Sequence, residues 1–136
     1  MNAGIQRFFA SLGSDGCFAI CIAEGGKPGR PARDMVELAI QGQQFRYLRS
    51  DMLVLKQAAF MGLCAGGQWT HTVELASYQP NIDEICIEKW AYTDADGDKH
   101  EHFALRLDDG TLWDPLGNSE TLKQGRCIEK RIFRRL

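Results

Sequence analysis

The sequence predicts an α+β fold in a single domain, residues 1–136, with N-terminal helices packed on a C-terminal antiparallel sheet. The length of 136 residues, with 44% hydrophobic and 25% charged residues, is typical of one globular domain with its own core. Apolar residues recur at helical spacing in the first half of the chain and alternate with polar residues in the second half. Helices followed by strands along the chain indicate the α+β class.

The first half contains three segments with helical features. A serine suited to capping starts the first helix, expected over residues 14–24, and a second helix is expected over residues 32–41. A third helix is expected from residue 50 to the stop at Gly66-Gly67. The apolar stripe of this third helix consists of Met52, Leu55, Ala59, Phe60 and Leu63.

The second half contains five strand-like segments. They are residues 69–75, 84–93, 99–107, 111–114 and 126–134. Residues 94–98 and 108–110, rich in Asp and Gly, have the composition of hairpin turns. The prediction for this half of the chain is an antiparallel meander.

Charge excludes a general affinity for polyanions. Sixteen basic and eighteen acidic residues give a net charge of −2. The basic residues between Arg126 and Arg135 are interpreted as a charged edge strand, which discourages aggregation between sheets. A nucleic-acid surface is the weaker interpretation, because aromatic residues that would stack on bases are not interleaved with them. We therefore predict no nucleic-acid partner.

Hydropathy and cysteine usage indicate a cytoplasmic protein without a membrane partner. No apolar run approaches the roughly 20 residues of a membrane helix. Residues 13–15, Gly-Ser-Asp, interrupt any signal-peptide core. The five cysteines are an odd number without a CxxC motif, which favours reduced thiols over a disulfide scaffold.

Cys17 is a candidate nucleophile because it lies in the first turn of the first predicted helix. Backbone N–H groups and the helix dipole stabilise a thiolate there. Gly16 leaves room beside the sulfur for a substrate backbone. The competing interpretation of Cys17 is a small buried hydrophobic residue, as most cysteines without a disulfide are.

His102 is the candidate base, in the strand expected over residues 99–107, where it opens the segment 102–107. Ala104, on the same face as His102, would let a helix approach closely. The competing interpretation is an exposed histidine at a strand end, equivalent to His100. We select His102 because its position beside Ala104 is more sheltered than the tip that His100 occupies.

The length of the turn after this strand decides whether Asp114 can reach His102. With a two-residue turn, Asp114 shares the face of Leu105 and points away from the histidine. With the three-residue turn 108–110 and Gly110 left-handed, Asp114 lies diagonal to His102, within side-chain reach. The same register sets Trp113 opposite Leu105 on the core face. We adopt the three-residue turn because it places Asp114 on the face of His102 and Trp113 on the core face.

The remaining residues that could bind a metal or take part in chemistry are interpreted as structural, and no cofactor or metal is implied. Residues 94–98 resemble a calcium loop, but the sixth and twelfth positions hold Lys99 and Leu105 in place of glycine and glutamate. Cys21 is expected in the core rather than in a zinc site with Cys17. His71 is expected to be half-buried with its hydrogen bonds satisfied.

The residue types around Cys17, His102 and Asp114, and their order along the chain, resemble those of the papain-like cysteine peptidase superfamily. Gly16-Cys17-Phe18 begins a helix, His102-Phe103 begins a strand, and Asp114-Pro115 lies on the next strand. This order is similar to that of bacterial peptidases that cleave double-glycine leader peptides. Residues 102–125 also resemble a papain-like family of bacterial and phage genomes whose function is unassigned. The resemblance covers about residues 14–21 and 100–125.

The resemblance implies a papain-like fold and a cysteine hydrolase that cleaves a peptide or amide bond. Cys17 would be the nucleophile, His102 the general base and acid, and Asp114 the carboxylate that orients His102. The peptidases place a glutamine a few residues before the cysteine, whereas here the upstream glutamine is Gln6, the candidate oxyanion donor. The alternative is an inactive papain-like domain with a binding or structural role, of phage origin. A basic-tailed nucleic-acid binder ranks last.

Overall fold

The computed structural model describes residues 14–136. Its helices are α2 (Ser14–Gly26), α3 (Ala32–Gln44), α4 (Gln57–Ala65) and α5 (Glu120–Gln124). Its strands are β1 (Trp69–Leu75), β2 (Ile85–Thr93), β3 (Lys99–Arg106), β4 (Leu112–Trp113) and β5 (Arg126–Arg135). Within residues 14–136, three helices precede the strands, so the predicted α+β class is confirmed, and α5 is the one helix there that was not expected.

The strands form one antiparallel sheet in the order β1-β5-β2-β3-β4. The predicted meander is therefore wrong, because β5 lies between β1 and β2 rather than beside β4. The basic C-terminal segment is accordingly a central strand and not the predicted edge strand. A meander follows from local hairpins, whereas the insertion of β5 depends on pairing between residues far apart in the sequence.

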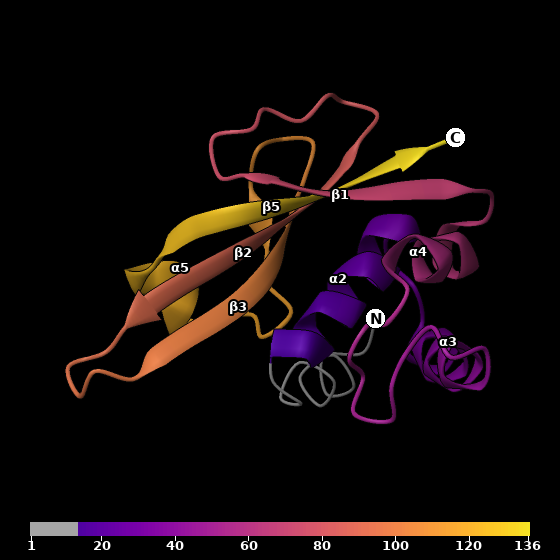
Figure 1. Cartoon of the computed structure of the whole chain (residues 1–136), viewed down its shortest axis with the longest axis horizontal. Coiled ribbons are helices and arrows are strands. Elements are labelled where there is room, and N and C mark those ends of the chain that lie inside the picture. Colours follow the sequence, from indigo (N-terminus) through magenta and orange to yellow (C-terminus); the bar gives the residue numbers. More distant parts are fainter. Residues whose placement is uncertain (1–13) are drawn as a thin grey trace.

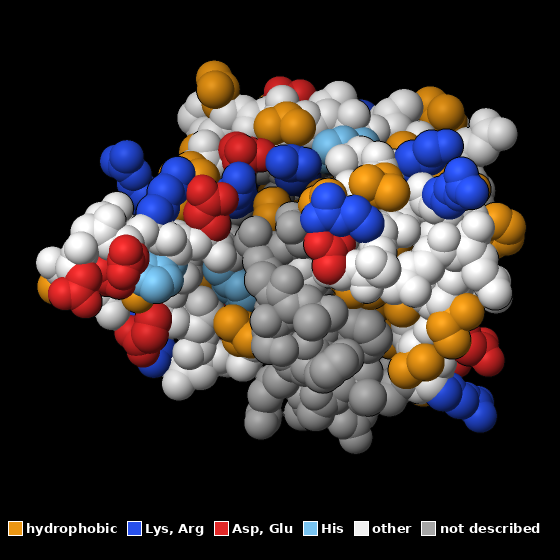
Figure 2. Space-filling model, turned by 60° about the horizontal axis from the view of Figure 1, so that its bottom comes forward, with side chains coloured by type: hydrophobic (Ala, Val, Ile, Leu, Met, Phe, Trp, Pro, Cys, Tyr) orange, Lys and Arg blue, Asp and Glu red, His pale blue; other side chains and the backbone are white. Residues whose placement is uncertain are grey.

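Three charged side chains of β5, Glu129, Arg131 and Arg134, form ion pairs at this central position. Arg131 pairs with Glu129 at 2.6 Å, and Lys89 of β2 bridges Glu129 at 3.9 Å and Glu101 of β3 at 2.9 Å. Arg134 forms an ion pair with Glu84. Basic and acidic side chains are also interspersed on the molecular face in Figure 2.

Helix α2 is the centre of the core. Every residue from Cys17 to Ala23 is buried, which suits a helix that is apolar on all sides. One side of α2 packs on the sheet, where the Phe18 ring stacks on Phe103 of β3 with centroids 4.6 Å apart. Its other side packs on α4, which in turn contacts α3 and β1. Helices α2 and α5 lie on opposite sides of strands β2 and β3 (Figure 1).

The prediction of a third helix from residue 50 is wrong over residues 50–56. Met52 adopts a positive φ of 73°, which a helix does not allow, and Asp51 Oδ1 accepts the Leu53 N–H at 3.2 Å. Leu48 and Val54 form an isolated antiparallel bridge. Met52 and Val54 are nevertheless buried, so the apolar residues of this segment indicate contact with the core rather than a helix.

Two further findings concern membrane-spanning helices and disulfide bonds. None of the helices in the described part of the chain is long and apolar enough to span a membrane. All five cysteines lie in that part of the chain, and none of them forms a disulfide.

Candidate functional site

The β3–β4 hairpin has the three-residue turn that the sequence predicted. The Leu107 N–H donates to the Thr111 carbonyl at 2.8 Å, and Gly110 is left-handed with φ 87°. The register sets Leu105 opposite Trp113. A left-handed residue at the third position of such a turn favours glycine, so Gly110 fixes the register.

This register brings His102 and Asp114 together. His102 Nε2 lies 2.7 Å from Asp114 Oδ1. The two side chains are 5% and 12% exposed, so water screens their interaction little. The predicted pairing of these two residues across the hairpin is confirmed.

A tight turn after β4 holds the carboxylate of Asp114. The Leu116 N–H donates to Oδ1 at 2.9 Å and the Ser119 N–H donates to Oδ2 at 2.7 Å. Gly117, with φ 82°, closes the turn through its N–H to the Asp114 carbonyl. Burial would raise the pKa of Asp114, but the hydrogen bonds from His102, Ser119 and Leu116 outweigh burial and lower it. Asp114 is therefore an ionised and fixed acceptor at neutral pH.

An ionised acceptor determines the tautomer of His102. A carboxylate only accepts hydrogen bonds, so the proton of the neutral ring resides on Nε2. Nδ1 then carries the lone pair, which is the group that a general base uses. The backbone amides of Leu116 and Ser119, which sequence reasoning missed, thus support the base indirectly. The turn residues Pro115 and Gly117 could have signalled them.

Cys17 lies against the strand that carries His102. The backbone N–H of Phe103 donates to Cys17 Sγ at 3.3 Å, across 86 positions of sequence. Strand β4 pairs with β3 only at Leu105 and Arg106, so the first turn of α2 occupies the side of β3 beyond the end of β4. The sulfur therefore lies next to the His102–Phe103 peptide, and Cys17 is fully buried.

Of the two neighbouring histidines, His102 is the sheltered one, as predicted. The side chain of His100 is 44% exposed, and its Nε2 contacts Asp94 Oδ2 at 2.7 Å in the β2–β3 turn. Asp94 also accepts the N–H groups of Asp96 and Asp98, so residues 94–98 form the expected hairpin turn. Gln6, the candidate oxyanion donor, lies outside the described residues.

The remaining chemical candidates have mixed outcomes. Cys21 is buried as predicted, and burial raises the pKa of its thiol well above the usual range. His71 is half-buried, but its Nε2 has no hydrogen-bond partner in the described structure, contrary to the prediction that it is satisfied. Within residues 14–136, no cluster of three or more His, Cys, Asp or Glu side chains could hold a metal ion.

Comparisons of the chain with protein-family models, with curated proteins and with solved structures find no match. The chemistry of the site has to be inferred from its own residues. A cysteine against the middle of β3, a histidine in that strand and a buried carboxylate hydrogen-bonded to the histidine are the parts of a thiol nucleophile with its base.

Proposed function

We propose that this protein is a cysteine hydrolase that cleaves a peptide or amide bond, with Cys17 as nucleophile, His102 as base and acid, and Asp114 as the orienting carboxylate. The observation that carries the proposal is that two contacts meet at neighbouring residues of β3. His102 Nε2 lies 2.7 Å from Asp114 Oδ1 in a buried pair, and the N–H of the next residue, Phe103, donates to Cys17 Sγ. The resemblance to papain-like peptidases at Cys17, His102 and Asp114 supports the same assignment.

In the proposed reaction, His102 Nδ1 takes the thiol proton of Cys17, and the resulting thiolate attacks the substrate carbonyl carbon. The imidazolium returns the proton to the departing amine as the C–N bond breaks, leaving a thioester on Cys17. The same imidazole then deprotonates a water molecule, which attacks the thioester and releases the acid and the thiol. Asp114 stabilises the imidazolium in both halves of the reaction.

One observation favours a second candidate function, an inactive papain-like domain with a binding or structural role. Cys17 is 0% exposed, whereas a nucleophile has to meet its substrate. The hydrolase requires that the surroundings of Cys17 open to admit a peptide, and the inactive domain does not.

Alkylation with iodoacetamide at pH 6 separates the two functions. Burial raises the pKa of the Cys64 and Cys86 thiols to about 12 and that of the Cys127 thiol to about 11, so these cysteines and Cys21 should react slowly. The hydrolase predicts that peptide mass mapping finds Cys17 labelled at least about tenfold faster than the half-buried Cys127. Equal or slower labelling of Cys17 would favour the inactive domain.

A matched pair of histidine variants tests the role of the base. His102→Asn should slow the labelling of Cys17, because it removes the group that takes the thiol proton. His100→Asn, two positions away on the same strand and exposed, should leave the rate unchanged. If both variants label Cys17 at the wild-type rate, His102 is not its base.

A further inference from the structure

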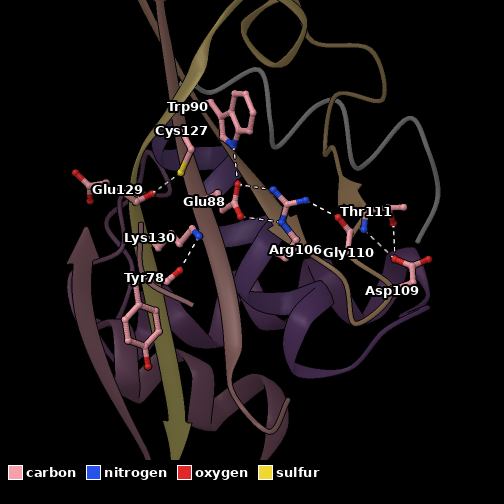
Figure 3. A network of polar contacts seen from close by, with 10 residues as sticks. All are labelled: Tyr78, Glu88, Trp90, Arg106, Asp109, Gly110, Thr111, Cys127, Glu129 and Lys130. Carbon is pink, nitrogen blue, oxygen red and sulfur yellow. Dashed lines mark hydrogen bonds and ion pairs between the residues drawn. The ribbon is translucent and has the colours of Figure 1, made fainter. Parts of the chain in front are cut away.

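A second cluster of ionisable side chains lies on the sheet face that carries His102. In the strand register Trp90 lies opposite His102, Glu88 opposite Ala104, and Lys130 of β5 opposite Glu88. Figure 3 shows the Glu88 carboxylate held by the guanidinium of Arg106 and by Trp90, with Lys130 on the neighbouring strand. The proposed hydrolase does not use this cluster.

The cluster forms the floor of a pocket. The pocket has a volume of about 560 Å³, within the range of small-molecule sites. Loop 79–84 forms one wall, and the β3–β4 turn forms another, with Asp108 and Gly110. Apolar side chains lie at its rim, including Ile82 at 89% exposure and Leu107 at 37%.

Lys130 is the unusual member of the floor. Only 9% of this residue is exposed. Within the described part of the chain, its Nζ donates one hydrogen bond, to the Tyr78 carbonyl at 2.7 Å, and no carboxylate oxygen lies within 4.0 Å of it. An ammonium has three N–H donors, and a buried charge without a counter-ion is costly. Lys130 therefore presents donors and a positive charge to a pocket.

The neighbouring charges are already paired with one another. Both oxygens of Glu88 accept from Arg106 at 2.8 Å, and Arg106 Nη1 donates to the Gly110 carbonyl at 2.5 Å. Glu84 accepts from the Tyr78 hydroxyl at 2.9 Å and forms its ion pair with Arg134. The floor formed by Glu88, Arg106 and Lys130 thus carries one net positive charge.

We propose that this pocket binds an organic monocarboxylate, with the carboxylate on Lys130 Nζ and an aliphatic portion against Ile82 and Leu107. The one excess positive charge of the floor matches one negative charge. The acidic side chains of Glu84, Glu88 and Asp108 in the pocket walls disfavour a dianion such as phosphate. Apolar rim residues beside a buried ammonium suit a ligand with an acid at one end and a hydrocarbon at the other.

Titration of the full chain with 4-methylpentanoate, followed by ¹H–¹⁵N NMR, tests the proposal. The amide signals of Tyr78, Asn81 and Lys130 should shift together along one binding curve, and the neutral 4-methylpentanamide should bind at least about tenfold more weakly. Equal binding of acid and amide, tighter binding of inorganic phosphate, or shifts confined to other parts of the chain would overturn the assignment.

Variants identify the groups that hold the acid. Lys130→Met should weaken binding of 4-methylpentanoate at least about tenfold, whereas Lys56→Met, at an exposed lysine outside the pocket, should not change it. Unchanged binding to Lys130→Met would refute the proposal.

Two variants at exposed positions test the same proposal if Lys130→Met does not fold. Asp108→Asn removes a negative charge from the wall and should tighten binding about 1.5- to 5-fold. Ile82→Asp places a carboxylate at the rim and should weaken binding by a similar factor. Absence of both effects would count against a carboxylate in this pocket.

Discussion

His102 Nε2 and Asp114 Oδ1 lie 2.7 Å apart because a three-residue turn, ending in a left-handed glycine, sets the two side chains diagonally across the β3–β4 hairpin. Asp114 receives two backbone N–H groups besides the histidine, so it organises the turn as well as the imidazole. Its substitution should therefore affect stability and reactivity together.

Asp114→Asn should destabilise the protein by about 2 kcal/mol at pH 7, because charge-assisted hydrogen bonds to a buried carboxylate are lost. The pKa of Asp114 is lowered, so its stabilisation is present above the unfolded pKa of about 3.9 and is lost as the pH falls below it. Urea denaturation should accordingly show a smaller loss of stability below pH 4 in the variant than in the wild type. The control is Asp108→Asn in the same exposed turn, which should change neither quantity; equal effects of both variants would contradict this role of Asp114.

Sequence patterns predicted the elements that local forces determine. The apolar run of α2, the alternation in β1 and the glycine of the β3–β4 turn were sufficient for those elements, and Gly110 fixed the register on which the His102–Asp114 pair depends. Long-range pairing was beyond such patterns. The insertion of β5 between β1 and β2 is decided by packing of the whole sheet, to which Phe133 contributes a fully buried side chain.

Two local predictions failed for physical reasons that are visible in the structure. The apolar residues Met52 and Val54 are buried in an irregular segment, where Asp51 caps a turn and Met52 is left-handed. Helix α5 has only five residues, too short for a periodic pattern. The contact between Cys17 and the Phe103 N–H links residues 86 positions apart, and only the fold brings them together.

His71 should make the protein less stable in mild acid. Burial and the nearby Arg131 lower the pKa of His71 to about 4, although Glu129 opposes this effect. Because a lowered histidine pKa favours the neutral ring in the folded state, the stabilisation is complete above about pH 6.5 and is lost as the pH falls towards 4. The loss should be about 1 kcal/mol, since the half-exposed ring is partly screened.

The variant His71→Phe keeps the ring contact with Phe133, whose centroid lies 4.9 Å away, and removes the titrating group. Its urea midpoint should change less between pH 7.5 and pH 4.5 than that of the wild type, whereas His100→Gln should retain the wild-type slope. If His71→Phe and the wild type have the same pH dependence, His71 is not the source of the acid sensitivity.

Gly125, between α5 and β5, should tolerate no side chain. A Cβ atom there would overlap the Thr121 carbonyl oxygen and lie 2.5 Å from the carbonyl oxygen of Ala91 in β2. Both obstacles are backbone atoms, so Gly125→Ala should cost about 3 kcal/mol, measured by thermal or urea unfolding. Gly97→Ala, at an open turn with φ 85°, is the control and should cost about 1 kcal/mol of strain. Equal costs would mean that the backbone at Gly125 moves aside easily.

Glu88 is a buried carboxylate on the sheet face that carries His102. Burial would raise the pKa of its carboxyl, but hydrogen bonds from Arg106 and Trp90 outweigh burial and lower it. Glu88→Gln should destabilise the protein by about 3 kcal/mol, because it leaves the Arg106 guanidinium without its counter-charge. Glu120→Gln, at an exposed site on α5, should have little effect.

The double variant Glu88→Met with Arg106→Met tests whether the instability of Glu88→Gln comes from the unpaired charge of Arg106. Removing both partners of a buried ion pair is often nearly neutral, whereas removing one is not, so the double variant should recover most of the stability lost in Glu88→Gln. Urea denaturation of the wild type and the three variants at pH 7 measures this difference. A double variant as unstable as Glu88→Gln would show that packing around Arg106, rather than charge balance, is what Glu88 supports.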